Sequence, residues 1–273
     1  TAANLQPGFH AIHANHLEDL RRAVVYLCRQ TPVPPLDSET FLVQSNGIAQ
    51  WLKLALAEKR SDEGFDGGLG IAAGMDFLFP ARFIWQAYRA VLPDGEVPEQ
   101  SPFDKRRLVW RLYRLLPELV PTDEAFAPLA RFLEGTDPDL RAFQLAEKVA
   151  DLFDQYQVFR ADWLSAWEQG REVMITARGE ESSLNSETLW QPRLWRALVA
   201  DVGELSQTSR SRIHTRFVEE GERLQRPAHP ERLPQRIVVF GVSSLPRQAL
   251  EALHVLSRFS QVVLCVHNPS QFY

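Results

Sequence analysis

The first candidate for chemistry is a row of polar side chains in the segment 142–159, which has helical periodicity. Asp151, Asp154 and Gln155 stand at i, i+3 and i+4, so a helix presents them on one side. Paired carboxylates can hold a metal ion, and they can also accept hydrogen bonds from the amino groups of bases. No lysine or glutamate follows at a spacing typical of nucleases, and no histidine is near in sequence. The row therefore favours solvated acids, acids that cap a basic neighbour, or base contacts over a catalytic metal.

Arg160 follows the same segment, and two interpretations of it stay open. Its guanidinium can reach guanine or a phosphate, or it can pair with Asp154 or Asp162. Acids repel phosphates, so carboxylates beside a DNA strand make sense only where bases are being read. We expect the aromatic residues of the segment to anchor its helix in the core; these are Phe153, Tyr156 and Phe159.

A second set of polar side chains flanks a predicted turn between a strand and a helix. Gln44 and Gln50 stand on either side of this turn, where side chains at the carboxyl edge of a parallel sheet point into a cleft. A glutamine amide both donates and accepts, so it can pair with a base edge, but helix capping explains the same residues equally well. For Asn46, in the turn itself, we expect capping.

Aromatic residues gather in the segment 76–85, which ends at Trp85. Phe79 lies in the same stretch. Such a tryptophan is more often a core residue than a platform on which a base stacks.

A basic stripe follows in the next predicted helix, opposite a row of leucines. Its cations are Lys105, Arg106, Arg107, Arg111 and Arg114. Most stripes of this kind are solvated faces, and contact with duplex DNA or with a partner subunit are the functional alternatives.

These residues must be positioned by an α/β fold. Apolar segments rich in β-branched or aromatic residues predict strands at 9–14, 39–45, 236–242 and 261–267. Because helical patterns follow the first three, we expect a parallel, doubly wound sheet. The long stretch between them is helical, so we expect a split α/β domain of residues 8–85 and 200–273 and an inserted helical domain of residues 86–199.

The sequence lacks the elements that hold ATP in a helicase fold. GxxxxGK[ST] occurs nowhere. The first strand ends in His13-Ala14-Asn15-His16, without a lysine or a glycine cradle, and a serine stands where a later strand should end in an acid that binds magnesium. We therefore expect no ATP turnover by this chain.

Composition narrows the class of protein further. The formal net charge of the 273 residues is −5, which excludes a global basic field. No apolar run is long enough to cross a bilayer, and the start of the chain lacks a signal-peptide layout. Cys28 and Cys265 have no motif spacing and indicate buried thiols of a cytosolic protein. The abrupt end after a predicted strand is typical of a fragment.

Several segments together resemble the RecC family, the gamma chain of exodeoxyribonuclease V. The similar segments run in register over nearly the whole chain, and they are 42–56, 76–85, 152–164, 190–199 and 267–273. The resemblance implies a superfamily 1 helicase-like fold without catalysis, in a heterotrimeric helicase-nuclease with a beta (motor-nuclease) chain and an alpha (helicase) chain. It implies that ATP and magnesium are used by those partners, with no cofactor or metal in this chain.

The same resemblance implies a role in repair of double-strand breaks by recombination. The family passes the unwound 3′-ended strand through a tunnel, where the strand is scanned for the Chi hotspot sequence. The residues expected along this tunnel are Gln44, Asn46, Gln50, Phe79, Trp85, Asp151, Leu152, Asp154, Gln155, Arg160 and Arg210. Arg210 is expected in a loop-like stretch. The alternatives are an active ATP-dependent helicase and a purely structural scaffold.

Overall fold

The computed structural model describes residues 5–59, 67–176, 178–224 and 232–270. The last three residues of the segment 267–273 lie outside this description. The chain divides into two compact units. Unit 1 comprises Thr1–Asp94 and Arg216–Tyr273, and unit 2 comprises Gly95–Thr215. These junctions lie later in the chain than the boundaries at 85 and 199 expected from the sequence.

Unit 1 is built on a five-stranded parallel sheet with the order β1-β7-β6-β2-β3. Its strands are β1 (Gly8–Ala14), β2 (Glu39–Val43), β3 (Met75–Leu78), β6 (Arg236–Phe240) and β7 (Gln261–His267). The four strands expected from the sequence are confirmed, as is the parallel α/β architecture with a helical insertion. The strand β3 was not expected; it is short, and only Phe79 separates it from Pro80 at the start of α3.

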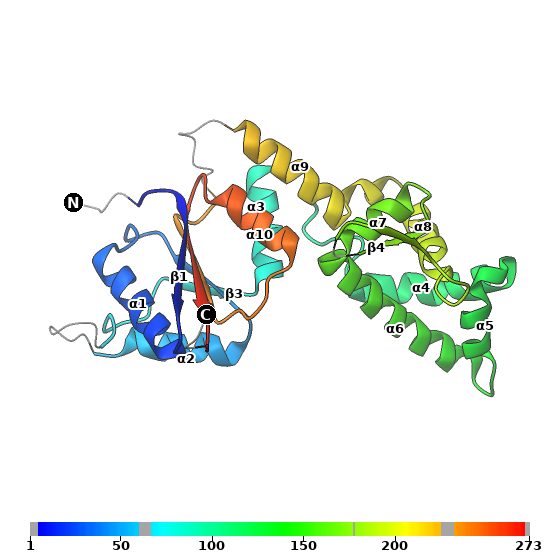
Figure 1. The fold of residues 1–273 in the computed structure, drawn as a ribbon, viewed down its shortest axis with the longest axis horizontal. Coiled ribbons are helices and arrows are strands. Elements are labelled where there is room, and N and C mark those ends of the chain that lie inside the picture. The colour runs from blue at the N-terminus through cyan, green and yellow to red at the C-terminus, as the bar shows by residue number, and fades with distance from the viewer. Residues whose placement is uncertain (1–4, 60–66, 177, 225–231, 271–273) are drawn as a thin grey trace. The chain divides into compact units, whose positions relative to one another are not determined.

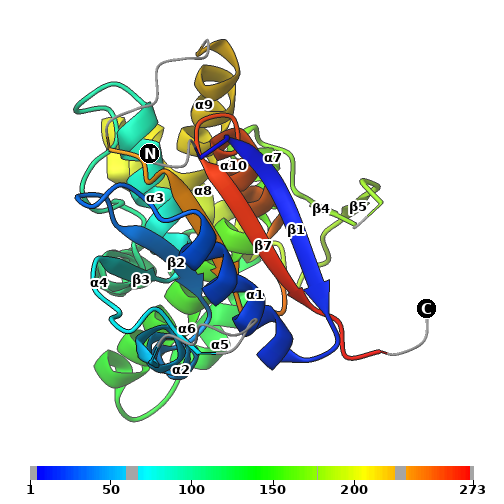
Figure 2. The same ribbon diagram turned by 90° about the vertical axis from the view of Figure 1, so that its left-hand side faces the viewer.

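Helices cover both faces of this sheet (Figures 1 and 2). The helices α1 (Leu17–Gln30) and α2 (Asn46–Ala57) lie on one face, and α3 (Pro80–Val91) and α10 (Arg247–Leu256) lie on the other. Residues of α1 and α2 share a buried cluster with alternate residues of β2, β6 and β7, which is the pattern expected when every second side chain of a strand points to one face. The helix α9 (Arg210–Arg223) contributes residues to both units.

A buried arginine ties together the amino ends of three adjacent strands. Arg236 begins β6 and its side chain is fully buried. Its Nη1 donates to Glu39 Oε1 at 2.7 Å, and Glu39 begins β2. Its Nε donates to Gln261 Oε1 at 2.7 Å, and Gln261 begins β7. Its Nη2 donates to Thr31 Oγ1 at 2.7 Å, after α1. Every nitrogen of the guanidinium therefore has an acceptor, which is what burial of a charge requires.

Both cysteines are free and buried in unit 1. Burial raises the pKa of each thiol to about 12, Cys28 in α1 and Cys265 in β7. Neither thiol ionises at neutral pH, so both behave as packing groups and not as reactive thiolates.

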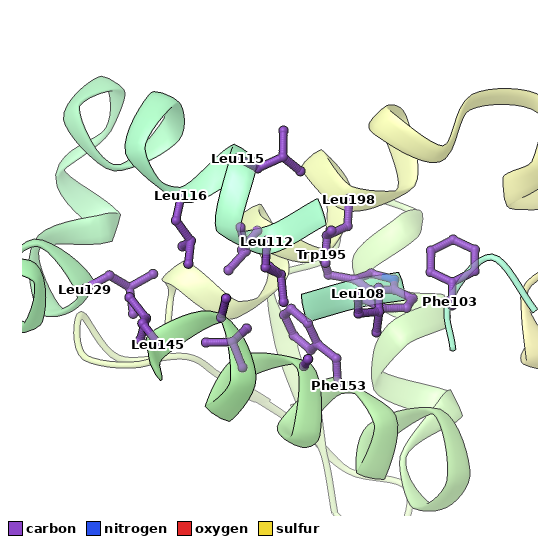
Figure 3. Close-up of a cluster of buried hydrophobic side chains, with 14 of the residues drawn as sticks. Phe103, Leu108, Leu112, Leu115, Leu116, Leu129, Leu145, Phe153, Trp195 and Leu198 are labelled. Carbon is purple, nitrogen blue, oxygen red and sulfur yellow. The ribbon is translucent and has the colours of Figure 1, made fainter. Parts of the chain in front are cut away.

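Unit 2 is helical. Its helices are α4 (Lys105–Leu119), α5 (Ala127–Leu133), α6 (Pro138–Phe159), α7 (Ala161–Glu168) and α8 (Trp190–Val202), with the 3-10 turns η1 (Val120–Thr122), η2 (Glu124–Phe126) and η3 (Gly203–Thr208). A small hairpin of β4 (Val173–Ile175) and β5 (Glu181–Ser183) was not expected from the sequence. Leucines of α4 meet Phe153 of α6 and Trp195 of α8 in one core (Figure 3). This core fixes which sides of α4 and α6 face the solvent.

The buried arginine gives the first prediction. Arg236→Met leaves Glu39 buried without its cation, so we expect the free energy of unfolding, measured by urea titration, to fall by about 3–5 kcal/mol. Because the cost comes from the stranded carboxylate, Arg236→Met combined with Glu39→Leu should recover a large part of the loss. A double variant no more stable than Arg236→Met alone would contradict this account. The exposed Arg89→Ala is the control, with an expected change within about 0.5 kcal/mol.

Candidate nucleic-acid interface

In unit 1 the candidate residues lie at the carboxyl edge of the sheet. Gln44 follows β2 and is exposed. Its Oε1 accepts from the backbone nitrogen and the Oγ of Ser243, each at 3.4 Å. Ser243 follows β6, the parallel neighbour of β2, so the two chain segments leave the sheet side by side. The Nε2 of Gln44 donates to no residue in the described part of the chain, so the amide presents a free donor to the solvent.

The turn after β2 is capped by a different residue from the one expected. Ser45 is the N-cap of α2, and its side chain accepts from the backbone nitrogen of Ile48 at 3.3 Å. The capping role expected for Asn46 is therefore wrong. Asn46 is the first residue of α2 and is exposed, and Gln50 is exposed one turn later on the same side. Neither amide therefore caps α2, and capping was the alternative to base contact.

A glycine lets α2 approach β6 closely at this edge. Gly241, after β6, has φ of 65°, and a Cβ there would lie 3.0 Å from Cγ2 of Ile48. A side chain would be strained by its backbone and crowded by α2. The glycine therefore serves packing of the turn, not a phosphate cradle.

The two aromatic candidates flank the start of α3. Phe79 is 46% exposed, directly after β3. Trp85 is half-buried, and its ring meets Tyr88 edge-on with centroids 6.1 Å apart. Tyr88 is buried against Phe217, at 4.8 Å. Trp85 therefore packs on the core through Tyr88 and keeps part of its side chain exposed.

In unit 2 the row on α6 forms as expected, and each member has its own environment. Asp151 pairs with Lys105 of α4 at 2.5 Å and accepts from Gln155 Nε2 at 3.2 Å. The Lys105 ammonium holds the pKa of Asp151 below its usual range. Asp154 is more enclosed, and Arg210 Nη2 lies 4.0 Å from its Oδ1. Burial raises the pKa of Asp154, with Arg210 opposing the rise. Two neighbouring carboxyls of one row therefore differ in proton affinity.

Two residues around this row differ from the expectations from the sequence. Arg210 begins the helix α9, so its stretch is not a loop. Phe159 is 63% exposed and does not anchor α6 in the core, in contrast to Phe153. Leu152 is half-buried beside the row.

Arg160 is held by protein groups. Its guanidinium pairs with Asp162 through Nε at 3.2 Å and Nη2 at 3.1 Å. It also donates to the backbone oxygen of Ile175 and lies over the ring of Trp163, 3.9 Å from the centroid. Of the two interpretations left open by the sequence, pairing with Asp162 is the one that the structure contains. Arg160 joins the end of α6 to α7 and the β4–β5 hairpin.

Most of the basic stripe also serves the protein itself. Arg111 and Arg114 both form ion pairs with Asp201 in the last turn of α8, and Lys105 pairs with Asp151. Asp201 and Ser243 were not expected from the sequence, because each lies far along the chain from the residue it binds. Only the strand pairing of β2 with β6 could have suggested Ser243.

The described residues contain no group of three or more histidine, cysteine, aspartate or glutamate residues that could hold a metal ion. They also contain no helix long and apolar enough to span a membrane.

The contacts of Arg160 predict a role in stability. Arg160→Ala removes an ion pair, a hydrogen bond and a cation–π contact, so we expect the free energy of unfolding to fall by about 1–2 kcal/mol. The exposed Arg106→Ala of the same unit should change it little. Equal stability of the two variants in urea titration would show that Arg160 is not a structural residue.

The environment of Asp154 predicts a titration order. Its pKa is raised and that of Asp151 is lowered, so Asp154 should take up a proton at the higher pH as the solution is acidified. Arg210→Ala removes the cation nearest to Asp154 and should raise its pKa further. Carboxyl carbon NMR of selectively labelled chain measures both values, and a lower pKa for Asp154 than for Asp151 would refute the assignment.

Comparison with known proteins places this geometry in a family. Residues 9–273 match the family described as RecC, N-terminal domain. The chain is 37% identical over 264 residues to the RecBCD enzyme subunit RecC of Escherichia coli strain K12, covering 96% of this chain and 22% of the relative. It is 35% identical to the same subunit of Haemophilus influenzae, covering 97% and 24%. For Mycolicibacterium smegmatis the identity is 24%, covering 95% and 21%.

The chain spans less than a quarter of the length of these relatives, all of which carry the same description. The match nevertheless includes both units, from the first strand of the sheet to the last. The chain belongs to the RecC family, as its N-terminal domain.

Proposed function

We propose that this chain is a DNA-handling module without chemistry of its own, which guides an unwound 3′-ended strand and inspects its bases for a hotspot sequence. The observation that carries the proposal is the type of side chain left exposed in each unit. Unit 1 presents the amides of Gln44, Asn46 and Gln50, and unit 2 presents the row around Asp154. Amides and carboxylates hydrogen-bond to base edges, whereas phosphates call for cations.

The residues that stand where a helicase has its nucleotide-binding elements support this assignment. We infer that the parallel sheet is of superfamily 1 helicase type with a degenerate site. The turn after β1 offers Asn15 and His16, and that after β6 offers Gly241 and Ser243. Neither turn has the lysine or the acid that phosphates and magnesium require. These turns therefore give no support to the alternative function, an active ATP-dependent helicase.

The partners follow from the relatives, which are described as subunits of the RecBCD enzyme. We propose that the full-length protein assembles with a beta motor-nuclease chain and an alpha helicase chain in the bacterial cytoplasm. In this scheme the partners use ATP and magnesium, and this chain binds no cofactor. The complex would act in recombinational repair of double-strand breaks.

A scaffold role is the second candidate, and the contacts of Arg160 favour it for that residue. Arg160 has Asp162, Ile175 and Trp163 as partners and little freedom to reach DNA. We therefore assign base contact to Gln44, Asn46, Gln50, Asp154 and Gln155, with Phe79 and Trp85 as stacking rings. Within the row Asp151 pairs with Lys105, and Leu152 and Arg210 lie beside it.

The test uses the full-length protein in its assembled complex. Gln44→Ala and Asp154→Asn remove base-contacting groups without removing a core residue, so unwinding should proceed at the normal rate. Hotspot-dependent cutting should fall by about tenfold, since one base contact is worth ~1–3 kcal/mol. Unwinding and hotspot cutting are measured on one substrate with and without the hotspot.

Two matched variants serve as controls. Gln6→Ala removes an exposed amide outside the turn, and Asp139→Asn neutralises an exposed acid in the first turn of α6. Both should behave as the unmodified protein. If Gln44→Ala and Asp154→Asn instead lose unwinding together with assembly, the residues are structural and the proposal fails.

A further inference from the structure

Three aromatic rings lie together on the outer side of α4 and α6. Trp110 of α4 is 64% exposed. Its ring centroid lies 5.7 Å from that of Phe143 on α6 and 6.2 Å from that of Tyr113. Tyr113 meets Trp110 edge-on and Phe143 meets it at a tilt, so neither ring is stacked flat on the indole. We call these three residues the aromatic patch. The core of unit 2 uses the leucines of α4, and Tyr113 packs against it, whereas Trp110 and Phe143 are not among the residues of this core.

The aromatic patch is continuous with the candidate row on α6. Phe143, Glu147, Asp151 and Gln155 follow one another at steps of four residues, so successive members are neighbours and the four form one slanting row along this helix. Lys105 of α4 reaches the same side, because it donates to Asp151 and its pKa is raised by Asp151, Asp154 and Glu147. One surface of the α4–α6 pair therefore carries rings at one end and carboxylates and amides along the rest.

Charge divides this surface lengthwise. The exposed residues of α4 before Trp110 are cations, and Arg106 stands one turn before it with no ion-pair partner in the described part of the chain. The corresponding side of α6 carries acids and an amide. A single strand of DNA has the complementary division, with charged phosphates along one side and base amino groups along the other.

We propose that Trp110 is a stacking platform for an unpaired base of single-stranded DNA, at the end of the row that reads the following bases. The proposal rests on the proposed function of the row. Phosphates run along the Lys105–Arg106 side of α4, base edges face α6, and one base lies on the indole with Tyr113 and Phe143 holding the ring in place. Stacking tolerates any base, so Trp110 contributes affinity and not sequence preference.

A docking surface for another protein is the competing explanation of an exposed tryptophan. The centres of such interfaces are depleted in charged residues. Here a cation and an acid lie about one helical turn from the patch, Arg106 on α4 and Glu147 on α6. These surroundings favour a nucleic acid as the occupant.

The first arm of the test needs no variant. The full-length protein in its assembled complex is irradiated with a 3′-tailed oligonucleotide that carries 5-iodouracil at single positions of the tail. We expect an adduct on Trp110 or Tyr113 at one tail position, identified by mass spectrometry of the peptides. Crosslinks confined to other peptides at every tail position would overturn the proposal.

The second arm compares Trp110→Ala, Trp110→Phe and the control Phe132→Ala, which removes an exposed ring on α5. Trp110→Ala should weaken binding of the single-stranded tail by about tenfold, Trp110→Phe should restore most of it, and Phe132→Ala should have no effect. Hotspot preference should be unchanged. Unchanged tail affinity for Trp110→Ala, or lost assembly with the partner chains, would overturn the proposal, the latter by showing a protein interface.

A variant in the row on α6 distinguishes failure of the stacking proposal from failure of the proposed function. Gln155→Ala in the same complex should reduce hotspot-dependent cutting. If Gln155→Ala does so while Trp110→Ala leaves affinity unchanged, the stacking platform is wrong and the function stands. If hotspot cutting survives Gln155→Ala, Gln44→Ala and Asp154→Asn alike, the function itself is wrong.

Discussion

The buried charge of Arg236 is the constraint on which the α/β unit depends. A guanidinium without water requires an acceptor for each of its nitrogens, and here the acceptors come from the starts of β2 and β7 and from the end of α1. The two strands that flank β6 are thereby fixed at their amino ends. In a parallel sheet this fixes where their other ends emerge.

This constraint also determines which residues meet at the carboxyl ends of the strands. The register that pairs Thr40 with Ile237 brings the end of β2 beside the end of β6, and there Gln44 meets Ser243. Gly241 allows α2 to start directly over this point. The polar end of the sheet in unit 1 therefore depends on packing at the opposite ends of the strands, and the side chains named there, Gln44 and Ser243, are uncharged.

In unit 2 Arg160 and the row on α6 differ in how firmly the protein's own contacts hold them. Arg160 has several protein partners at once, and a contact of its guanidinium with DNA would require these contacts to be broken. The pair of Asp151 with Lys105 is half-exposed, and such pairs contribute little to stability. A base that displaced Lys105 from Asp151 would therefore meet little resistance from the fold.

The sequence predicted those features that follow from local pattern. The strands β2 and β6 are runs of buried apolar residues, and the middle of the chain has clear helical periodicity, so both were expected correctly. The strand β3 is only four residues long and β5 is entirely exposed, so neither has a pattern that marks a strand. The cap at Ser45 depends on backbone angles that Ser45 and Asn46 could equally have adopted.

The candidate site was predictable in its residue types but not in its pairings. Spacing placed Asp151, Asp154 and Gln155 on one side of a helix, and the structure has them so. That Lys105 would neutralise Asp151 and Arg210 would approach Asp154 depends on helix packing, since these partners lie far apart in the chain. The exposure of Phe159 likewise follows from where α6 ends, which periodicity does not define.

The most direct test of the account is hydroxyl-radical footprinting of the full-length protein in its assembled complex, with and without a DNA end that carries a 3′ tail. The account predicts that the tail protects side chains in both units, Phe79 and Trp85 in one and Leu152 in the other, because both units contact the strand. Oxidation of all three that is unaffected by the tail would contradict the claim that this chain handles the unwound strand.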